Sequence, residues 1–202
     1  MSTETHQAIN AVWRIEQAKL VAGLARMVRD IGVAEELAQD ALVVALERWP
    51  ETGIPDNPGA WLMATAKRRA IDRIRHLKMQ DRKHAEIGYG LDQEQDDVVE
   101  ALEARLDDDI GDDLLKLVFT ACHPVLSREA RVALTLRLIG GLSAAEIARA
   151  FFVPEPTIAQ RIVRAKRTLA ESDIAYEVPR GEELAPRLAS VCEVIYLIFN
   201  EG

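Results

Sequence analysis

The sequence predicts an all-α fold made of two small helical domains joined by an acidic linker. Apolar residues recur every three or four positions along most of the chain, and no segment shows the alternation that is typical of a strand. Ala, Leu, Ile, Glu and Arg dominate, whereas aromatic residues make up only 5% of the 202 residues, which favours helices over sheets. Acidic residues gather in one stretch with few large apolar side chains, as expected of a linker.

The first predicted domain covers residues 1–83 and contains three helices, at about 6–30, 34–48 and 58–79. Gly32 is expected to turn the chain between the first two helices. Pro50 is expected to begin a stiff loop before the third helix. Asn57 and Pro58 form a favourable start for that helix, because asparagine caps a free amide and proline has no amide to satisfy.

The linker is predicted at residues 84–111, and the second domain at residues 112–172. A helical pattern resumes at Asp112, and Pro124 and Ser127 interrupt it. The helices expected after this interruption lie at about 128–139, 143–150 and 155–171. Residues 173–202 are expected to begin a further helical segment.

The segment 141–171, GLSAAEIARAFFVPEPTIAQRIVRAKRTLAE, predicts two helices separated by a tight turn. Ser143 and Glu146 form the S-x-x-E pattern of a capping box, and Pro156 fits the first turn of the second helix. One side of this second helix is apolar and consists of Ile158, Ile162, Ala165 and Leu169. The other side carries Thr157, Gln160, Arg161, Arg164 and Arg167. A cationic helix supported by another helix suits the DNA major groove, although two ordinary amphipathic helices of a bundle would show the same pattern.

Charge is distributed unevenly along the chain, whose net charge is −8. Residues 67–83 contain eight Lys or Arg and two acids, and residues 127–170 contain eight Lys or Arg and three acids. Residues 86–113 contain twelve acids and a single arginine. Two basic blocks on either side of an acidic one suggest two nucleic-acid-binding surfaces on a tether, whereas mutual pairing of the blocks would explain the distribution without a ligand.

Two further helical stripes are candidate binding surfaces. In the third helix, Trp61 shares a side with Arg68, Asp72 and Arg75, which suits unpaired DNA because bases stack on aromatic rings while phosphates meet cations. A solvated basic side with a core tryptophan is the alternative. In the second helix, one stripe can dock a basic protein surface or can simply be solvated, and it consists of Glu36, Gln39, Asp40, Val43 and Glu47.

Enzymatic readings find little support in the sequence. Cys122 and His123 are adjacent, so on a helix they point in different directions, and no metal-binding spacing accompanies them. Cys122 is expected to be a small buried hydrophobe. No catalytic residue, metal or cofactor is predicted, and the absence of a signal peptide and of long apolar runs predicts a cytoplasmic protein without membrane insertion.

Taken together, these segments resemble the extracytoplasmic-function sigma factors of bacterial RNA polymerase. NPGAWLMATAKRRAIDRIR (57–75) is similar to the family's region two, and 141–171 is similar to its region four. AEELAQDALVVALERW (34–49) resembles the helix that grips the polymerase clamp. DDLLKLVFTACHPVLSREARVALTLRLIGGL and IAYEVPRGEELAPRLASVCEVIYLIFNEG resemble a subgroup with a helical, tetratricopeptide-like C-terminal extension. The chain stops at Gly202, where that extension would begin, and is therefore expected to be a truncated form.

The resemblance implies a promoter-specificity subunit that binds core polymerase, recognises and helps to melt promoter DNA, and has no catalysis of its own. The residues implied at the minus-thirty-five element are Thr157, Gln160, Arg161 and Arg164, with Lys166 and Arg167 as phosphate anchors. Those implied at the minus-ten element are Asn57, Trp61, Lys67, Arg68, Asp72 and Arg75. Those implied at the polymerase clamp are Glu36, Gln39, Asp40, Val43 and Glu47. A regulatory contact with the C-terminal extension is a further expectation.

Two positions depart from the family's pattern. Arg68 stands where the family often has asparagine, and Phe152 replaces the usual turn glycine. Two other functions are also compatible with the sequence. One is a free-standing transcription regulator that uses only the helices of 143–171. The other is a helical adaptor that binds proteins through 181–199, where an apolar stripe consists of Leu184, Leu188, Val191, Ile195 and Ile198.

Overall fold

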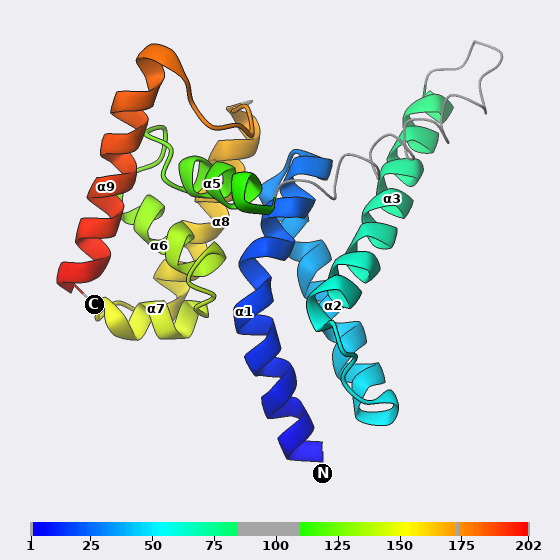
Figure 1. The fold of residues 1–202 in the computed structure, drawn as a ribbon. Coiled ribbons are helices and arrows are strands. Elements are labelled where there is room, and N and C mark those ends of the chain that lie inside the picture. The colour runs from blue at the N-terminus through cyan, green and yellow to red at the C-terminus, as the bar shows by residue number, and fades with distance from the viewer. Residues whose placement is uncertain (1, 85–109, 173, 202) are drawn as a thin grey trace.

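The computed structural model describes residues 2–84, 110–172 and 174–201, and within these ranges all regular structure is helical (Figure 1). The elements are α1 (Ser2–Val28), α2 (Ile31–Thr52), α3 (Pro58–His84), α5 (Ile110–Ala121), α6 (Arg128–Leu138), α7 (Ala144–Ala150), α8 (Glu155–Glu171), the 3-10 helix η1 (Gly181–Glu183) and α9 (Leu184–Glu201). The all-α prediction is confirmed. Most of the predicted linker, residues 85–109, lies outside the described residues.

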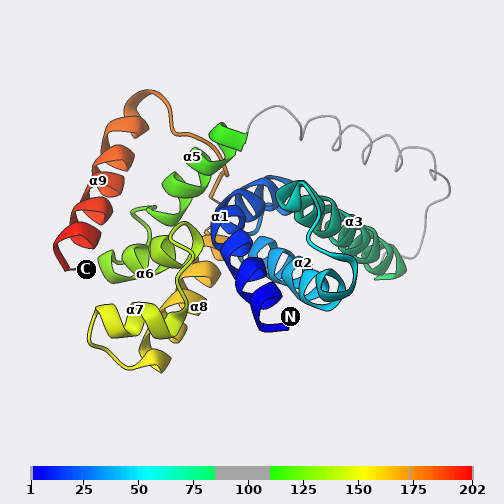
Figure 2. The same cartoon turned by 60° about the horizontal axis from the view of Figure 1, so that its bottom comes forward.

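The helices form two units that lie side by side. The first unit, which we call the α1–α3 bundle, contains α1, α2 and α3 packed against one another. The second, which we call the α5–α8 unit, contains α5, α6, α7 and α8, and α9 runs along its outer side (Figures 1 and 2). The first bundle meets the second unit mainly where α1 packs on α5.

Two helix boundaries predicted for the first bundle are wrong. The chain turns at Arg29, which has a left-handed backbone with φ of 54°, and not at Gly32. Asp30 then caps α2 by accepting a 3.0 Å hydrogen bond from the amide of Val33, so Gly32 falls within the first helical turn. Pro50 lies inside α2 rather than in the following loop. The helix continues past this proline because Trp49 is buried in the bundle and its carbonyl oxygen accepts a hydrogen bond from Gly53.

The boundaries predicted for α6, α7 and α8 agree with the structure to within one residue, whereas α5 begins at Ile110, two residues before the predicted start. Ser127 caps α6 by accepting a hydrogen bond from the amide of Ala130, as its position before the helix predicts. The helices α6, α7 and α8 begin and end close to the predicted positions 128–139, 143–150 and 155–171. These positions could be predicted because a serine or a proline, which is typical of a helix start, precedes each helix.

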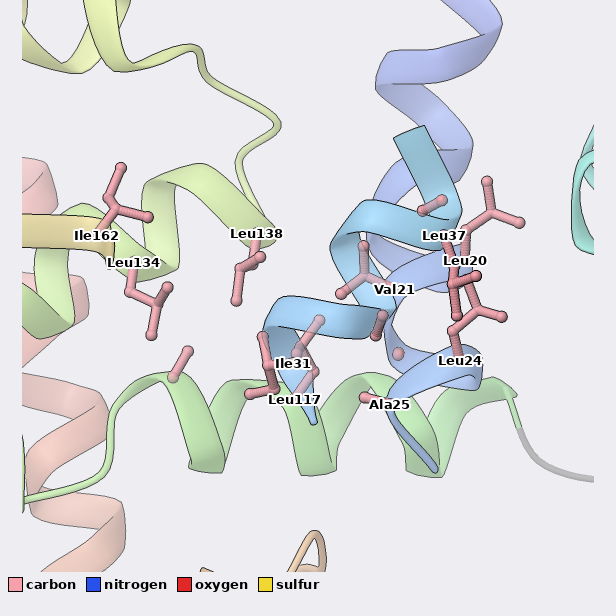
Figure 3. Close-up of a cluster of buried hydrophobic side chains, with 14 of the residues drawn as sticks. Leu20, Val21, Leu24, Ala25, Ile31, Leu37, Leu117, Leu134, Leu138 and Ile162 are labelled. Carbon is pink, nitrogen blue, oxygen red and sulfur yellow. The ribbon is translucent and has the colours of Figure 1, made fainter. Parts of the chain in front are cut away.

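Apolar side chains from both units form one continuous core. Figure 3 shows Val21 of α1 and Ile31 of α2 facing Leu117 of α5, with Leu138 of α6 alongside. These side chains are all buried. The two predicted domains are therefore packed against each other in this structure, a contact that the sequence analysis did not foresee.

The last helix, α9, rests on the second unit through a small separate core. Val191 and Val194 of α9 pack there with Phe119 of α5 and Val132 of α6. Three members of the apolar stripe considered for this segment are exposed, namely Leu184, Leu188 and Ile195, as a stripe without a partner inside the chain would be. The packed side of α9 is rotated from the predicted stripe toward Val194.

Candidate nucleic-acid interface

The predicted helix-turn-helix is present, and a capping box fixes the start of its first helix, α7. The amide of Glu146 donates to Ser143 Oγ at 3.2 Å, and the amide of Ser143 donates to Glu146 Oε2 at 2.8 Å. Hydrogen bonds from the Ser143 backbone amide and hydroxyl lower the pKa of the Glu146 carboxyl, and nearby Arg14 and Arg149 add to this effect. The S-x-x-E pattern therefore has the local structure that the sequence predicts.

The turn between α7 and α8 keeps the geometry of a glycine turn although it contains a phenylalanine. Phe152 has φ of 53°, in the left-handed region that glycine favours. Around it, Val153 N donates to the Ala148 carbonyl at 3.0 Å and Phe152 N to the Arg149 carbonyl at 3.4 Å, which is the Schellman pattern of a helix C-terminus. The aromatic ring is 96% exposed. The turn is thus maintained by its backbone hydrogen bonds and not by packing of the ring.

The predicted apolar side of α8 is the side that it buries. Ile158, Ile162, Ala165 and Leu169 are all in the core. On the opposite side the predicted DNA-reading residues Thr157, Gln160, Arg164 and Arg167 are exposed, and Arg161 is partly exposed. Arg167 donates to Glu171 Oε1 one turn later at 2.6 Å. The structure therefore brings five of the six predicted upstream contacts to one solvent-facing side of a well-anchored helix.

A hollow on the surface separates the reading side of α8 from the start of α6. Ser127, which caps α6, and Glu129 of α6 line it together with Thr157, Gln160 and Arg161 of α8. The pKa of the Glu129 carboxyl is lowered chiefly by its own backbone amide at the helix start and by Ser127, with a smaller effect from Arg161. Glu129 therefore places a carboxylate beside the basic side of α8.

Lys166 differs from the other basic residues of α8 because the first bundle holds it. Its ammonium group forms an ion pair with Glu35 Oε2 of α2, and Arg137 Nε of α6 donates to Glu35 Oε1 at 2.7 Å. Glu35 is 2% exposed, and the side chain of Lys166 is 23% exposed. In this arrangement a carboxylate occupies the place on Lys166 that the sequence analysis assigned to a DNA phosphate.

The other basic helix, α3, presents several of the predicted downstream contacts to solvent. Arg68, Asp72 and Arg75 are exposed, whereas Lys67 is only partly exposed. Lys67 lines a second hollow, between α1 and the start of α3, together with Asn57. Asn57 Oδ1 also accepts a 3.0 Å hydrogen bond from the amide of Ala60, so this residue caps α3 as predicted.

Trp61 is only partly accessible. Its ring packs edge-to-face against Trp49 of α2, with the ring centroids 5.2 Å apart and the planes at 64°. Trp49 is buried and Trp61 is half-buried. Trp61 therefore combines the two interpretations considered from the sequence, since it belongs to the core of the bundle and still has an accessible part.

The predicted clamp-facing stripe of α2 is largely exposed and is already engaged with α3. Arg73 Nη1 donates to Glu36 Oε2 at 3.3 Å, and Arg69 Nη1 donates to Asp40 Oδ2 at 2.8 Å. Gln39 donates to Glu35 Oε1 at 2.9 Å. The two other members of the stripe, Val43 and Glu47, are exposed. The acidic stripe thus neutralises part of α3 within the same bundle.

The sequence analysis missed four polar residues that lie between the two units: Gln17, Glu35, Asp113 and Tyr176. Gln17 Nε2 donates to the Arg137 carbonyl at 3.2 Å, and Arg26 Nε lies 3.3 Å from Asp113 Oδ2. The hydroxyl of Tyr176 lies 3.0 Å from the carbonyl oxygens of Ala22 and of Asp113, so its single proton can be donated to either. Burial, with a further contribution from Asp113, raises the pKa of the Tyr176 hydroxyl, which keeps the proton on it.

One of these residues had a signal in the sequence. Glu35 lies on the apolar side of α2, among Ile31, Ala34 and Ala38, where a charge needs a partner from elsewhere in the fold. Asp113 carried no such signal, because it reads as the last acid of the acidic segment. The sequence could therefore predict that Glu35 has a buried partner but could not name it.

Cys122 and His123 have structural partners. Cys122 is buried and its Sγ lies 3.4 Å from Thr135 Oγ1, and burial raises the pKa of this thiol. The amide of Val125 donates to His123 Nδ1 at 3.1 Å. No three His, Cys, Asp or Glu side chains gather around a common point in the described part of the chain, and none of its helices is both long and apolar enough to cross a membrane.

Comparison with known proteins assigns both units. The family model of sigma-70 region 2 matches residues 14–79, and that of sigma-70 region 4 matches residues 116–169. An uncharacterized protein of Rhizobium meliloti (strain 1021) is 41% identical over 183 residues, which are 90% of this chain and 43% of that protein. The probable ECF RNA polymerase sigma factor SigI of Mycobacterium tuberculosis (strain ATCC 25618 / H37Rv) is 33% identical over 175 residues, 86% of this chain and 58% of that protein.

The chain thus spans about half the length of these two relatives. It covers more of the ECF RNA polymerase sigma factor SigK of Mycobacterium ulcerans (strain Agy99), with 30% identity over 151 residues, 72% of this chain and 75% of that protein. The region 2 match falls on the bundle that contains α3, and the region 4 match falls on the unit that contains the helix-turn-helix. On this agreement of sequence and architecture, the chain belongs to the extracytoplasmic-function sigma factors of bacterial RNA polymerase.

Proposed function

We propose that this chain acts as a promoter-specificity subunit that binds core RNA polymerase and directs it to a two-part promoter. The observation that carries the proposal is the side of α8 opposite its buried stripe, where reading residues face solvent on a helix that α7 supports. A second basic helix, α3, lies in the same chain. The polymerase supplies the chemistry, and the chain contributes recognition alone.

At the upstream, minus-thirty-five element, α8 enters the major groove. Arg161 and Arg164 have the two parallel donors that match the acceptor edge of guanine, and Gln160 can both donate to and accept from adenine. The Thr157 methyl group can contact the methyl group of thymine. Arg167, near the end of the helix, meets phosphate oxygens and positions the helix without reading sequence.

At the downstream, minus-ten element, α3 and the loop before it bind DNA that has lost its pairing. Arg68 and Arg75 attract the backbone, and Asp72 offers an acceptor to base amino groups. The hollow that Asn57 and Lys67 line lies beside the loop of residues 53–57, which suits a base taken out of the stack. The accessible part of Trp61 is adjacent to that loop.

The acidic stripe of α2 docks the polymerase. Glu36, Asp40 and Glu47 provide negative charge, and exposed Val43 provides an apolar contact between them. Surfaces of complementary charge steer association and fix register. Rupture of the pairs with Arg69 and Arg73 on docking would release positive charge on α3 for DNA.

The proposed division of labour follows the chain. Residues 1–83 bind polymerase and the minus-ten element, residues 84–111 form the linker, and residues 112–172 bind the minus-thirty-five element. Residues 173–202 provide a regulatory contact. Val191 and Val194 pack against the core of the α5–α8 unit. This packing supports a regulatory role for residues 173–202, because a change in the position of α9 would alter its contacts with that unit.

The test is transcription with purified components. Core polymerase plus this chain should produce transcripts from genomic promoters that core polymerase alone ignores. Replacement of Arg161 or Arg164 by alanine should weaken binding to the mapped upstream element by about 1–3 kcal/mol each, because a base contact is lost. Arg180→Ala, at an exposed basic residue away from both surfaces, is the matched control. Equal weakening on all DNA sequences would show that these arginines contact phosphate, and tight duplex binding without polymerase would favour a free-standing regulator.

A further inference from the structure

Helix α9 lies beyond both family matches, yet it is fastened to the α5–α8 unit by charged and polar side chains. The region 4 match ends at residue 169, and α9 begins at Leu184. The helix packs against α6 (Figure 2), and the start of α6 borders the reading side of α8. Ion pairs between α6 and α9 accordingly lie close to the residues that we propose to contact DNA.

One carboxylate of α9, that of Glu193, is shared by two arginines of α6. Arg131 Nη1 lies 3.1 Å from Glu193 Oε2, and Arg128 Nη2 forms an ion pair with Glu193 Oε1. The two arginines differ in exposure, because the side chain of Arg131 is 13% exposed and that of Arg128 is 59% exposed. The same carboxylate thus has one partner that is largely shielded from solvent and one that faces solvent.

Arg131 is the partner that holds Glu193 in place. Its guanidinium also donates to Ser190 Oγ, and the Ser190 hydroxyl donates to the carbonyl oxygen of Cys122 at 2.5 Å. Ser190 is buried, and Cys122 directly follows α5, so these contacts join α5, α6 and α9. Since Arg128 takes no part in them, they hold Glu193 in place whether or not Arg128 is paired.

Arg128 is the partner that DNA can take over. An ion pair between exposed side chains contributes little to stability, because water solvates both charges and the pairing restricts two long side chains. A guanidinium can bind a phosphate through two parallel hydrogen bonds, and neutralisation of DNA phosphates releases condensed counterions. DNA can therefore replace Glu193 as the partner of Arg128. It cannot do the same on Arg131, because that side chain is largely shielded from solvent.

Arg128 lies next to a residue that we assign to the upstream element. A small hollow with a volume of about 200 Å³ is lined by Arg128 and Glu129 of α6 and by Arg161 of α8, among others. The pKa of the Glu129 carboxyl is lowered chiefly by its own backbone amide and by Ser127, and both Arg161 and Arg128 lower it further. Glu129 also lines the hollow on the reading side of α8. Arg128 therefore flanks that reading side, where contacts to phosphate position a helix in the groove.

We propose that Arg128 is a further DNA-binding residue, which contacts a phosphate beside the minus-thirty-five element, and that Glu193 of α9 competes with DNA for it. This inference rests on the proposed function and adds a regulator of its upstream site. While Glu193 is paired with Arg128, it neutralises a positive charge next to Arg161 and lowers the affinity for DNA of any sequence. A displacement of α9 that separates the pair frees Arg128 and strengthens binding. The last helix thus adjusts the affinity of the α5–α8 unit without contacting a base.

The competition can be tested by fluorescence anisotropy, with the full chain binding a 30-base-pair duplex at low salt. Glu193→Gln should tighten binding roughly two- to fivefold on a duplex of any sequence, because Arg128 no longer has to leave an ion pair. Glu182→Gln removes an exposed carboxylate of η1 and should leave binding unchanged, as a control for net charge. In an Arg128→Gln background, Glu193→Gln should have little effect. Equal tightening in both backgrounds would overturn the competition.

A conservative variant separates a DNA contact from a structural role. Arg128→Lys keeps the charge and should retain the salt dependence of the parent protein, whereas Arg128→Gln should lower it by about one released ion, with thermal unfolding unchanged. If Glu193→Gln fails to fold, because Arg131 also pairs with it, these two variants decide. The same salt dependence for all three proteins would overturn the role of Arg128. A reduced salt dependence of Arg128→Gln, together with no transcription promoted by the parent chain, would support this role and refute the proposed function.

Discussion

The two basic helices, α3 and α8, are held in the fold by different proportions of large and small buried side chains. Helix α8 inserts the branched side chains Ile158 and Ile162 into the core. Helix α3 buries Leu62 near its start and then the alanines Ala66 and Ala70, so the stretch that contains the alanines lies close to its neighbours in the bundle. A helix anchored by large side chains is sensitive to truncation, whereas one anchored by close approach is sensitive to enlargement.

Their charges are also treated differently. Helix α3 lies beside the acidic stripe of α2, and two of its arginines, Arg69 and Arg73, pair with carboxylates of its own bundle. Helix α8 turns Arg164 and Arg167 to solvent and reaches the other bundle through Lys166. The two helices have similarly basic sequences, but the neighbouring helix decides which of their charges are paired with carboxylates and which face solvent.

The largest expected effect tests the anchoring of α8. Ile158→Ala should lower the free energy of unfolding by about 2–5 kcal/mol, because the side chain is fully buried and its removal leaves a cavity. Val163→Ala on the same helix, where the side chain is exposed, should change it by less than about 0.5 kcal/mol. Urea denaturation of both variants measures the difference. Similar values for the two would mean that α8 is not anchored as described.

Enlargement of a buried side chain tests the packing of α3. Ala66→Leu should destabilise the protein by about 1–3 kcal/mol, since the alanine is fully buried and a larger side chain must displace the groups packed around it. Ala64→Leu, at an exposed position two residues earlier, is the matched control and should be nearly neutral. Thermal unfolding followed by circular dichroism compares them. A stabilising Ala66→Leu would reveal unfilled space beside α3.

A substitution in the turn before α8 is expected to raise the stability of the protein. Phe152→Gly should stabilise the protein by roughly 1 kcal/mol, because glycine adopts the left-handed backbone without strain and the exposed ring contributes little packing. Phe152→Ala retains the strain and should remain close to the parent protein. Chemical denaturation of the three proteins gives the ranking. Equal stability of the glycine and alanine variants would show that the left-handed backbone of Phe152 does not lower the stability of the parent protein.

The smallest expected effect concerns the ion pairs between arginines of α3 and carboxylates of α2. Asp40→Asn removes the partner of Arg69, yet both side chains are about half exposed, so the loss should be under about 1 kcal/mol. Measured in 0.05 M and 0.5 M NaCl, the loss should shrink as salt screens the pair. A large loss that is insensitive to salt would show that this pair is structural and would not release Arg69 when polymerase docks.

Much of the fold was predictable because its signals are local. The capping box at Ser143 and the asparagine cap at Asn57 each lie within one helical turn, the apolar stripe of α8 lies within one helix, and each has the expected geometry. The two wrong boundaries have a different origin. Gly32 and Pro50 are helix-breaking residues in isolation, but the cap at Asp30 and the burial of Trp49 outweigh their local preference.

The sequence by itself determined which segments are helices, which side of α8 is buried and which side of it faces solvent. These properties depend on residue spacing along a single helix. The tertiary structure alone decided that Lys166 pairs with Glu35 and that the hydroxyl of Tyr176 lies against the carbonyl oxygen of Ala22, because the residues of each pair are separated by more than a hundred positions. The spacing of residues along one helix cannot predict such a long-range contact, because the contact forms only when two helices pack against each other.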